Sequence, residues 1–303
     1  WRYLLKVGIY FPLILALWLV VYLVNTMSWY LIINDEGRCE GLSFWRVYKL
    51  TVSGFALNYT TPCGLMGGEP YRIMELKPYT GVSKATSSVI LYVMMHIFSH
   101  FWFWFLSIFL FIAFNPVGLS MGILLAVIGG FCLLGIYFFS RGYKTGMAQK
   151  GIHLLTHIPF VKGWAKRFAE SKKDTLEQID SQIALLHQQH KRTFYSSLLF
   201  ELSARVLQSF EIYLILKAFN AEVGIIDSIL ILAFSSLFSN LIFFTPMQLG
   251  SREGGLALAV DGLHLTGALG VYTGLITRLR ELVWIAIGIM LIKIGNKNQL
   301  PKD

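Results

Sequence analysis

The chain has 303 residues, of which 55% are apolar and only 14% are charged, and its mean hydropathy is +0.59. A soluble domain carries about 25% charged residues, so this composition excludes a disordered chain and a water-soluble globule. The formal net charge is +9. On a soluble protein that charge would suggest nucleic-acid binding, whereas in a membrane protein the positions of Lys and Arg indicate the cytoplasmic side.

Runs of apolar residues long enough to cross a membrane recur along the chain. A transmembrane helix needs about 20 mostly apolar residues. Seven runs are candidates, the second of them weak because Arg46 and Lys49 stand at its start. They cover residues 4–24, 43–60, 86–114, 118–140, 194–217, 226–245 and 268–292. The sequence therefore predicts an all-α polytopic membrane protein that forms a single membrane domain over residues 1–303.

Two further apolar stretches, 61–84 and 246–267, are broken by Pro and Gly. Non-helical backbone at membrane depth is tolerated only where protein or a water-filled cavity surrounds it, so both are predicted to be re-entrant segments. Seven spans would leave the C-terminus outside, although Lys293, Lys297 and Lys302 favour the cytoplasmic side. One additional crossing within 246–267 would resolve this conflict, so we expect seven or eight transmembrane helices.

The longest polar segment, 141–192, holds ten of the 26 basic residues and four acidic ones. Cytoplasmic loops carry an excess of Lys and Arg, so this segment and the N-terminus are predicted to be cytoplasmic. Leu176, Ile179 and Ile183 repeat at helical spacing. That spacing fits either an amphipathic helix on the membrane surface or a helical cap packed on the protein itself.

The two broken stretches resemble each other. Thr61-Pro62 precedes Glu69 at the same spacing as Thr245-Pro246 precedes Glu253. Each stretch follows a Ser-containing apolar span and precedes a further span. We therefore predict an internal repeat, which is either parallel or inverted. Its two copies cover residues 43–114 and 226–292.

The breaks predict a turn followed by a new helix. Proline ends the preceding helix, and glycine lets the chain turn and approach a ligand closely. The predicted hinge residues are Pro62, Gly64, Gly67, Gly68, Pro246 and Gly250. Glu69 and Glu253 would then stand at the start of a short helix. There a carboxylate either stabilises the helix N-terminus or is a polar group of a transporter site.

Arg205 and Arg278 each lie about ten residues into an apolar span, near the expected bilayer centre. A charge at that depth costs about 2.5–3.5 kcal/mol on insertion scales and indicates a functional site by default. The guanidinium fork suits a phosphate, because it binds an oxyanion bidentately and stays protonated. The alternative is a structural ion pair, of Arg205 with Glu201 or of Arg278 with Glu281. The same two spans also contain Glu211 and Arg280.

His96 and His100 stand four residues apart but lack the Glu of a zinc-protease motif. We expect them to face a water-filled cavity, and we expect no metal and no cofactor. The cysteines Cys39, Cys63 and Cys132 are odd in number and widely spaced, so they predict neither a disulfide framework nor a zinc site.

The residues around the two breaks form two motifs. The first consists of Asn58, Thr61-Pro62, Gly64, Gly67-Gly68-Glu69-Pro70, Arg72, Gly81-Val82 and Ala85. The second consists of Thr245-Pro246, Gly250, Arg252-Glu253-Gly254-Gly255 and Arg278. These motifs resemble the two signatures of a flippase-like membrane family, named after the transmembrane region of lysylphosphatidylglycerol synthase. Cys63 stands where the family usually has a glycine, and Met247-Gln248 stands where it usually has a glycine-rich pair.

The resemblance covers about 45–290 and implies an integral membrane protein that moves lipids between leaflets. The lysine-transferring synthases of this family carry a separate soluble domain, for which a chain ending at Asp303 leaves no room. We therefore transfer only the flippase-like function and expect a transporter rather than an enzyme, without catalytic residues.

We accordingly expect a lipid translocase in a prokaryotic inner membrane. Its partners would be membrane lipids with anionic, phosphate-bearing head groups, either phospholipid derivatives or polyprenyl-phosphate carriers, and not nucleic acid. The expected substrate-binding residues are Glu69, Arg72, Glu201, Arg205, Arg252, Glu253, Arg278 and Glu281. Two alternatives stay open: a membrane-embedded enzyme acting on a lipid phosphate or glycolipid, and a non-transporting partner protein that acts through 141–192. The oligomeric state also stays open.

Overall fold

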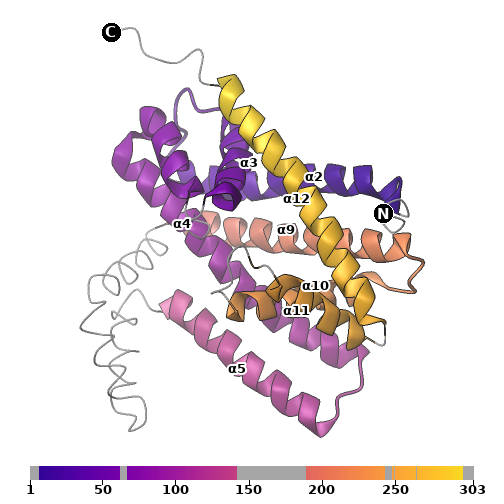
Figure 1. Cartoon of the computed structure of the whole chain (residues 1–303). Helices are drawn as coiled ribbons and strands as arrows, with labels where there is room; N and C mark the ends of the chain where they lie inside the picture. The colour runs from indigo at the N-terminus through magenta and orange to yellow at the C-terminus, as the bar shows by residue number, and fades with distance from the viewer. Residues whose placement is uncertain are drawn as a thin grey trace, which may run out of the picture.

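A computed structural model of the chain describes residues 7–61, 67–141, 189–242, 248, 250–263 and 265–295. These residues form helices and no strand, which confirms the all-α expectation. In chain order the helices are α2 (Tyr10–Ile33), α3 (Phe44–Thr60), α4 (Gly68–Phe114), α5 (Leu119–Arg141), α9 (Lys191–Ala218), α10 (Ile225–Leu241), α11 (Ser251–Asp261) and α12 (Gly267–Gly295). Each of the seven predicted spans overlaps one of them (Figure 1).

Three helices, α2, α4 and α5, are long and apolar enough to cross a membrane. Helices α9 and α12 have 28 and 29 residues, but charged side chains near their middles lower their apolarity. The count of seven or eight transmembrane helices stays a prediction.

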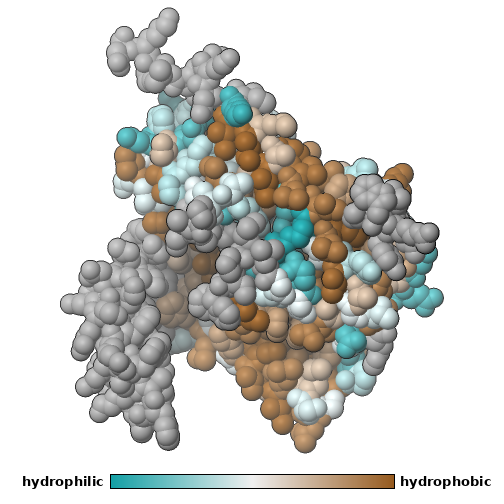
Figure 2. All heavy atoms as spheres, in the orientation of Figure 1, coloured by the Kyte–Doolittle hydropathy of each residue, from teal (hydrophilic) through white to brown (hydrophobic). Residues whose placement is uncertain are grey.

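Helix α5 lies at the edge of the bundle and packs against α4 (Figure 1). Its side chains Leu119, Val127 and Leu134 are between 66% and 85% exposed. Figure 2 shows large hydrophobic areas on the face in view, with a small hydrophilic patch among them. Extensive exposed apolar surface is unusual for a soluble monomer and suits an integral membrane protein.

The remaining helices pack around a central space. Helix α2 lies along α9, α12 packs against α3 and α11, and α10 packs against α11, α9 and α4. In Figure 1, α12 crosses α2 and α9 diagonally. A buried apolar cluster that includes Trp29, Leu50, Leu76, Met95 and Phe98 joins α2, α3 and α4. These contacts fix the helices that carry the charged residues.

Helix α4 is interrupted near its first quarter. Pro78 lies inside the helix, and Gly81 has the non-helical angles φ 77° and ψ 164°. Proline removes a helical hydrogen bond, and glycine adopts a positive φ without steric cost. The stretch 61–84 therefore contains a short helical segment from Gly68 to the kink, and a longer helix follows it.

The start of α4 approaches α3 closely at Gly68. The backbone N–H of Gly68 donates to Asn58 Oδ1 over 2.6 Å, and Asn58 Nδ2 donates to Glu69 Oε1 over 3.0 Å. A Cβ atom on Gly68 would overlap the carbonyl oxygen of Gly54. Only glycine therefore permits this contact between the two helices.

We expect Gly68→Ala to lower the free energy of unfolding by about 1–3 kcal/mol, because the methyl group must push α4 away from α3. The matched control is Gly130→Ala in α5, where a Cβ atom meets nothing within 4 Å. That control should leave stability equal or slightly higher, since alanine favours helix by about 0.5–1 kcal/mol. Chemical unfolding in detergent micelles measures both, and equal stabilities for the two variants would contradict the close approach.

Candidate functional site

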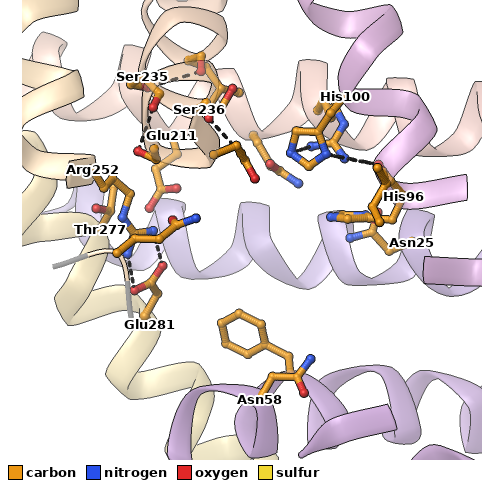
Figure 3. A pocket seen from close by; sticks show the side chains of 18 of the residues that line it. Asn25, Asn58, His96, His100, Glu211, Ser235, Ser236, Arg252, Thr277 and Glu281 are labelled. Atoms are coloured by element: carbon orange, nitrogen blue, oxygen red, sulfur yellow. Dashed lines mark hydrogen bonds and ion pairs between the residues drawn. The ribbon is translucent and has the colours of Figure 1, made fainter. Parts of the chain in front are cut away.

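A cavity of about 740 Å³ lies between the helices and receives side chains from all eight of those described. Its wall combines aromatic side chains with hydroxyl, amide and charged groups. Figure 3 shows Asn25, His96 and His100 on one side and Glu211, Arg252 and Glu281 on the other. A largely apolar pocket with a few convergent polar groups is the usual form of a ligand site.

On the first side, Arg205 of α9 is buried, with 5% of its surface exposed. Its Nε donates to Ser99 Oγ over 2.9 Å, and one terminal nitrogen donates to the His96 carbonyl oxygen over 2.8 Å. Its two terminal nitrogens lie 2.8 and 2.7 Å from the ring nitrogens of His100. All of these partners come from α4, so packing of α9 against α4 sets the orientation of the guanidinium.

None of the groups that hold Arg205 is an anion. The described part of the chain places no carboxylate within 4.0 Å of its guanidinium. Buried charges in proteins are ordinarily paired, and breaking such a pair leaves a costly uncompensated charge. Arg205 lines the cavity, so an anionic ligand entering there would supply the missing counter-charge.

The sequence left open an ion pair between Arg205 and Glu201, and the structure shows that this prediction is wrong. Glu201 is 1% exposed, and its Oε2 lies 2.8 Å from Nδ1 of His96. Its other oxygen, Oε1, has no hydrogen-bond partner. His96 comes from α4, which packs against α9. This contact between two helices replaces the pair within α9 that the four-residue spacing would allow.

On the opposite side, three arginines and three glutamates form a charge cluster, hereafter the six-residue cluster. Its members are Glu211, Arg252, Glu253, Arg278, Arg280 and Glu281. Arg252 donates to both oxygens of Glu281 over 2.5 and 2.7 Å. Arg278 donates to Glu253 over 3.0 Å and to Glu281 over 3.3 Å. The alternative pair of Arg278 with Glu281 is therefore present.

Arg280 and Glu211 complete the six-residue cluster. Arg280 donates to both carboxylate oxygens of Glu211 over 2.9 and 3.0 Å. The indole of Trp18 donates to Glu211 over 2.8 Å, and the guanidinium carbon of Arg280 lies 3.6 Å from the centroid of a Trp18 ring. Three cations thus face three carboxylates, so the cluster is neutral within itself.

Arg72 extends the first side of the cavity. It is 6% exposed, lies 3.7 Å from Glu69 and donates to the Thr51 carbonyl oxygen over 3.2 Å. The rings of Trp29 and Tyr92 flank its guanidinium at 5.6 and 5.5 Å. A weak ion pair and two aromatic faces hold this cation in place, and it contributes positive charge near Arg205.

The structure brings most of the predicted binding residues to the cavity wall. Glu69, Arg72, Arg205, Arg252 and Glu281 line it. Glu201, Glu253 and Arg278 are absent from the lining. Glu201 bonds to His96 and Arg278 bonds to Glu281, which both line the cavity, whereas Glu253 accepts hydrogen bonds from Arg278 and from the backbone N–H of Gly250. His96 and His100 also line the cavity, as the expectation of a water-filled cavity requires.

Two functional candidates were missing from the expected set, namely Glu211 and Arg280. Their only signal in the sequence was a charge within an apolar span, and nothing local indicated that they bind each other across 69 positions. Among the predicted hinge residues, Gly250 has a φ of 80°, and Gly67 and Gly68 precede Glu69. Pro62, Gly64, Pro246 and most of the segment 141–192 lie outside the described residues.

Comparison with known families identifies the chain. The family model of the lysylphosphatidylglycerol synthase transmembrane region matches residues 1–288. The chain therefore belongs to this family of membrane proteins, which relates it to lipid handling. No curated protein and no solved structure matches the chain.

Proposed function

From this membership, we propose that the protein is a lipid translocase that moves an anionic, phosphate-bearing lipid between the two leaflets. The observation that carries the proposal is Arg205, a buried cation on the cavity wall without a carboxylate within reach among the described residues. A phosphate diester bound beside it would neutralise its charge. The substrate would be a phospholipid derivative or a polyprenyl-phosphate carrier.

The two sides of the cavity would then have different roles. Arg205, supported by Arg72, would hold the phosphate. The six-residue cluster, in which the charges already balance, would fix α9, α11 and α12 relative to one another. Neutral polar groups that also line the cavity, such as Asn25, Asn58 and Ser236, would hydrogen-bond to the rest of the head group.

We further propose that the two halves form an internal repeat with re-entrant segments. Helices α3 and α10 both have 17 residues, and each is followed by a helix with a glutamate in its first turn, Glu69 in α4 and Glu253 in α11. A non-helical break then precedes a longer helix in both halves, at Gly81 and between α11 and α12. In addition, α3 packs against α12 of the other half, and α10 packs against α4. This reciprocal packing supports a binding site between repeats.

On this proposal the membrane is a prokaryotic inner membrane, with the N-terminus and the basic segment 141–192 on the cytoplasmic side. The excess of Lys and Arg in that segment supports the orientation. The given sequence contains no nucleotide-binding motif. This favours transport that is driven by an ion gradient or that proceeds as passive exchange.

The direct test reconstitutes the purified protein in phosphatidylcholine vesicles that contain fluorescent phosphatidylglycerol. A membrane-impermeant reductant bleaches the outer leaflet, and translocation exposes the inner-leaflet pool as well. We expect protein-dependent loss of the inner pool for labelled phosphatidylglycerol and much less for labelled phosphatidylcholine. Mass spectrometry of the recovered lipid should show no change in mass. No movement of any anionic lipid, labelled polyprenyl phosphate included, would rule out the translocase, and a changed mass would favour an enzyme.

A further inference from the structure

Arg205 and Glu201 occupy one turn of the same helix face, yet they do not pair. They are four residues apart on α9, a spacing at which opposite charges readily meet. Instead, Glu201 binds His96 at 2.8 Å, and Arg205 binds Ser99, His100 and the His96 carbonyl oxygen. The spacing therefore makes each of the two charged residues an alternative partner for the other.

We propose that this arrangement is a proton-binding site that couples the uptake of one proton, at His96, to the binding of an anion at Arg205. The inference rests on the proposed function, because it assumes that the anion is the head group of the transported lipid. The inference adds that a proton accompanies this lipid.

Charge balance distinguishes two states of the site. With the anion bound, Arg205 neutralises the anion and protonated His96 neutralises Glu201. Without the anion, Arg205 turns to Glu201, and His96 releases its proton to the cavity. Both states are neutral, so neither leaves a buried charge uncompensated. The structure shows the side-chain contacts of the first state, because Glu201 lies on His96 and Arg205 lies on Ser99 and His100 instead of on Glu201.

Burial supports the assignment of the proton to His96. Glu201 is 1% exposed and does not line the cavity, whereas the side chain of His96 is 40% exposed and does. A proton from the cavity therefore reaches the pair through the imidazole. Histidine is also the side chain whose charge changes most readily near neutral pH.

The other groups around the pair would not substitute for this exchange. From α4, Tyr92, His100 and Arg72 with its partner Glu69 face the same region. From α9 the charged neighbour is Arg205, and α2 and α10 present neutral groups to this side of the cavity, among them Asn25 and Ser236. Arg72 already has Glu69, so within the described residues Arg205 is the cation nearest to Glu201 that lacks a carboxylate.

Linkage gives the sign of the pH dependence. Since the anion binds the form in which His96 is protonated, anion binding must take up a proton, and protonation must strengthen anion binding by the same factor. Affinity for the anion should therefore fall as pH rises, by at most about tenfold per pH unit. A fixed arginine site without coupling would bind the anion equally well across this range.

The test is calorimetric titration of the detergent-solubilised protein with dihexanoyl phosphatidylglycerol, an anionic lipid that does not titrate near neutral pH. Measurements in two buffers of different ionisation enthalpy count the protons taken up on binding, and are repeated from about pH 6 to about pH 9 to span the histidine range. We expect uptake that rises towards about one proton per lipid, with affinity that falls over the same interval.

Two variants and one control separate coupling from a structural role. Glu201→Gln removes the alternative partner of Arg205, so it should bind the lipid without proton uptake and with affinity independent of pH. His96→Gln should likewise bind without proton uptake, but more weakly, because Glu201 now competes for Arg205. His190→Gln, at an exposed histidine whose side chain is 71% exposed, should keep the wild-type uptake.

Wild-type binding with no proton uptake at any pH would overturn the coupling and leave the translocase proposal intact. Failure of the wild-type protein to bind the anionic lipid at all would overturn both. The wild-type measurement needs no variant, so the result stands even if a substitution prevents folding.

Discussion

Replacing Arg205 by Gln should weaken binding of an anionic lipid by about a hundredfold, because a charge-assisted hydrogen-bonded contact contributes about 1.5–3 kcal/mol. Translocation of fluorescent phosphatidylglycerol in vesicles should fall in parallel. The reason is that Arg205 is the cavity cation whose described neighbours leave it without a carboxylate, so its charge is available to the ligand.

Two further variants test whether the effect depends on the guanidinium group of Arg205. Arg205→Lys retains the charge but loses the planar fork that binds two oxygens at once, so we expect an intermediate loss of about tenfold. Arg192→Gln removes an exposed arginine from the first turn of the same helix and should leave translocation unchanged. Wild-type rates in both Arg205 variants, in protein that elutes as a single folded species, would show that the anion is held elsewhere.

Replacing Glu281 by Gln should destabilise the protein by about 3–5 kcal/mol, the usual cost of removing one partner from a buried ion pair. Glu281 is 4% exposed. Its carboxylate accepts hydrogen bonds from both terminal nitrogens of Arg252 and from one terminal nitrogen of Arg278. A terminal nitrogen of Arg280 lies 3.8 Å from the same carboxylate. Its removal leaves three arginines facing two carboxylates, and thus one buried charge without compensation.

The free energy of unfolding in detergent micelles measures this effect. Glu222→Gln, at an exposed glutamate between α9 and α10, is the matched control and should change stability by less than about 0.5 kcal/mol. The double variant Glu281→Gln with Arg252→Gln restores the charge balance and should recover part of the loss, so the two changes should not be additive. Equal destabilisation by Glu281→Gln and Glu222→Gln would show that the six-residue cluster does not hold α11 and α12 together.

The two predictions assign different roles to arginines that the sequence alone did not distinguish. Arg205 and Arg278 both stand about ten residues into an apolar span, so depth assigned them the same role. The structure gives Arg278 two carboxylates, Glu253 and Glu281, and gives Arg205 none within 4.0 Å among the described residues. We therefore expect Arg278 to stabilise the packing of its helices, and we propose Arg205 as the residue that binds the ligand.

Local patterns in the sequence determined the secondary structure and the positions of the charges along the helices. Apolar runs of span length predict helices because each backbone bond is then satisfied within the segment, and the helices observed follow those runs. The Thr-Pro breaks placed Glu69 and Glu253 in the first turns of new helices. The i,i+3 pair of Arg278 with Glu281 was likewise within reach of spacing arguments.

Only the tertiary structure decided which charges neutralise each other. Glu201 had Arg205 four positions away but binds His96, 105 positions away, and Arg280 binds Glu211 across 69 positions. The periodicity of the sequence shows which side chains share a helix face, but it does not show which neighbouring helix packs against that face. Because a buried charge is stabilised chiefly by its nearest counter-charge, helix packing determines which of the described arginines have a carboxylate beside them.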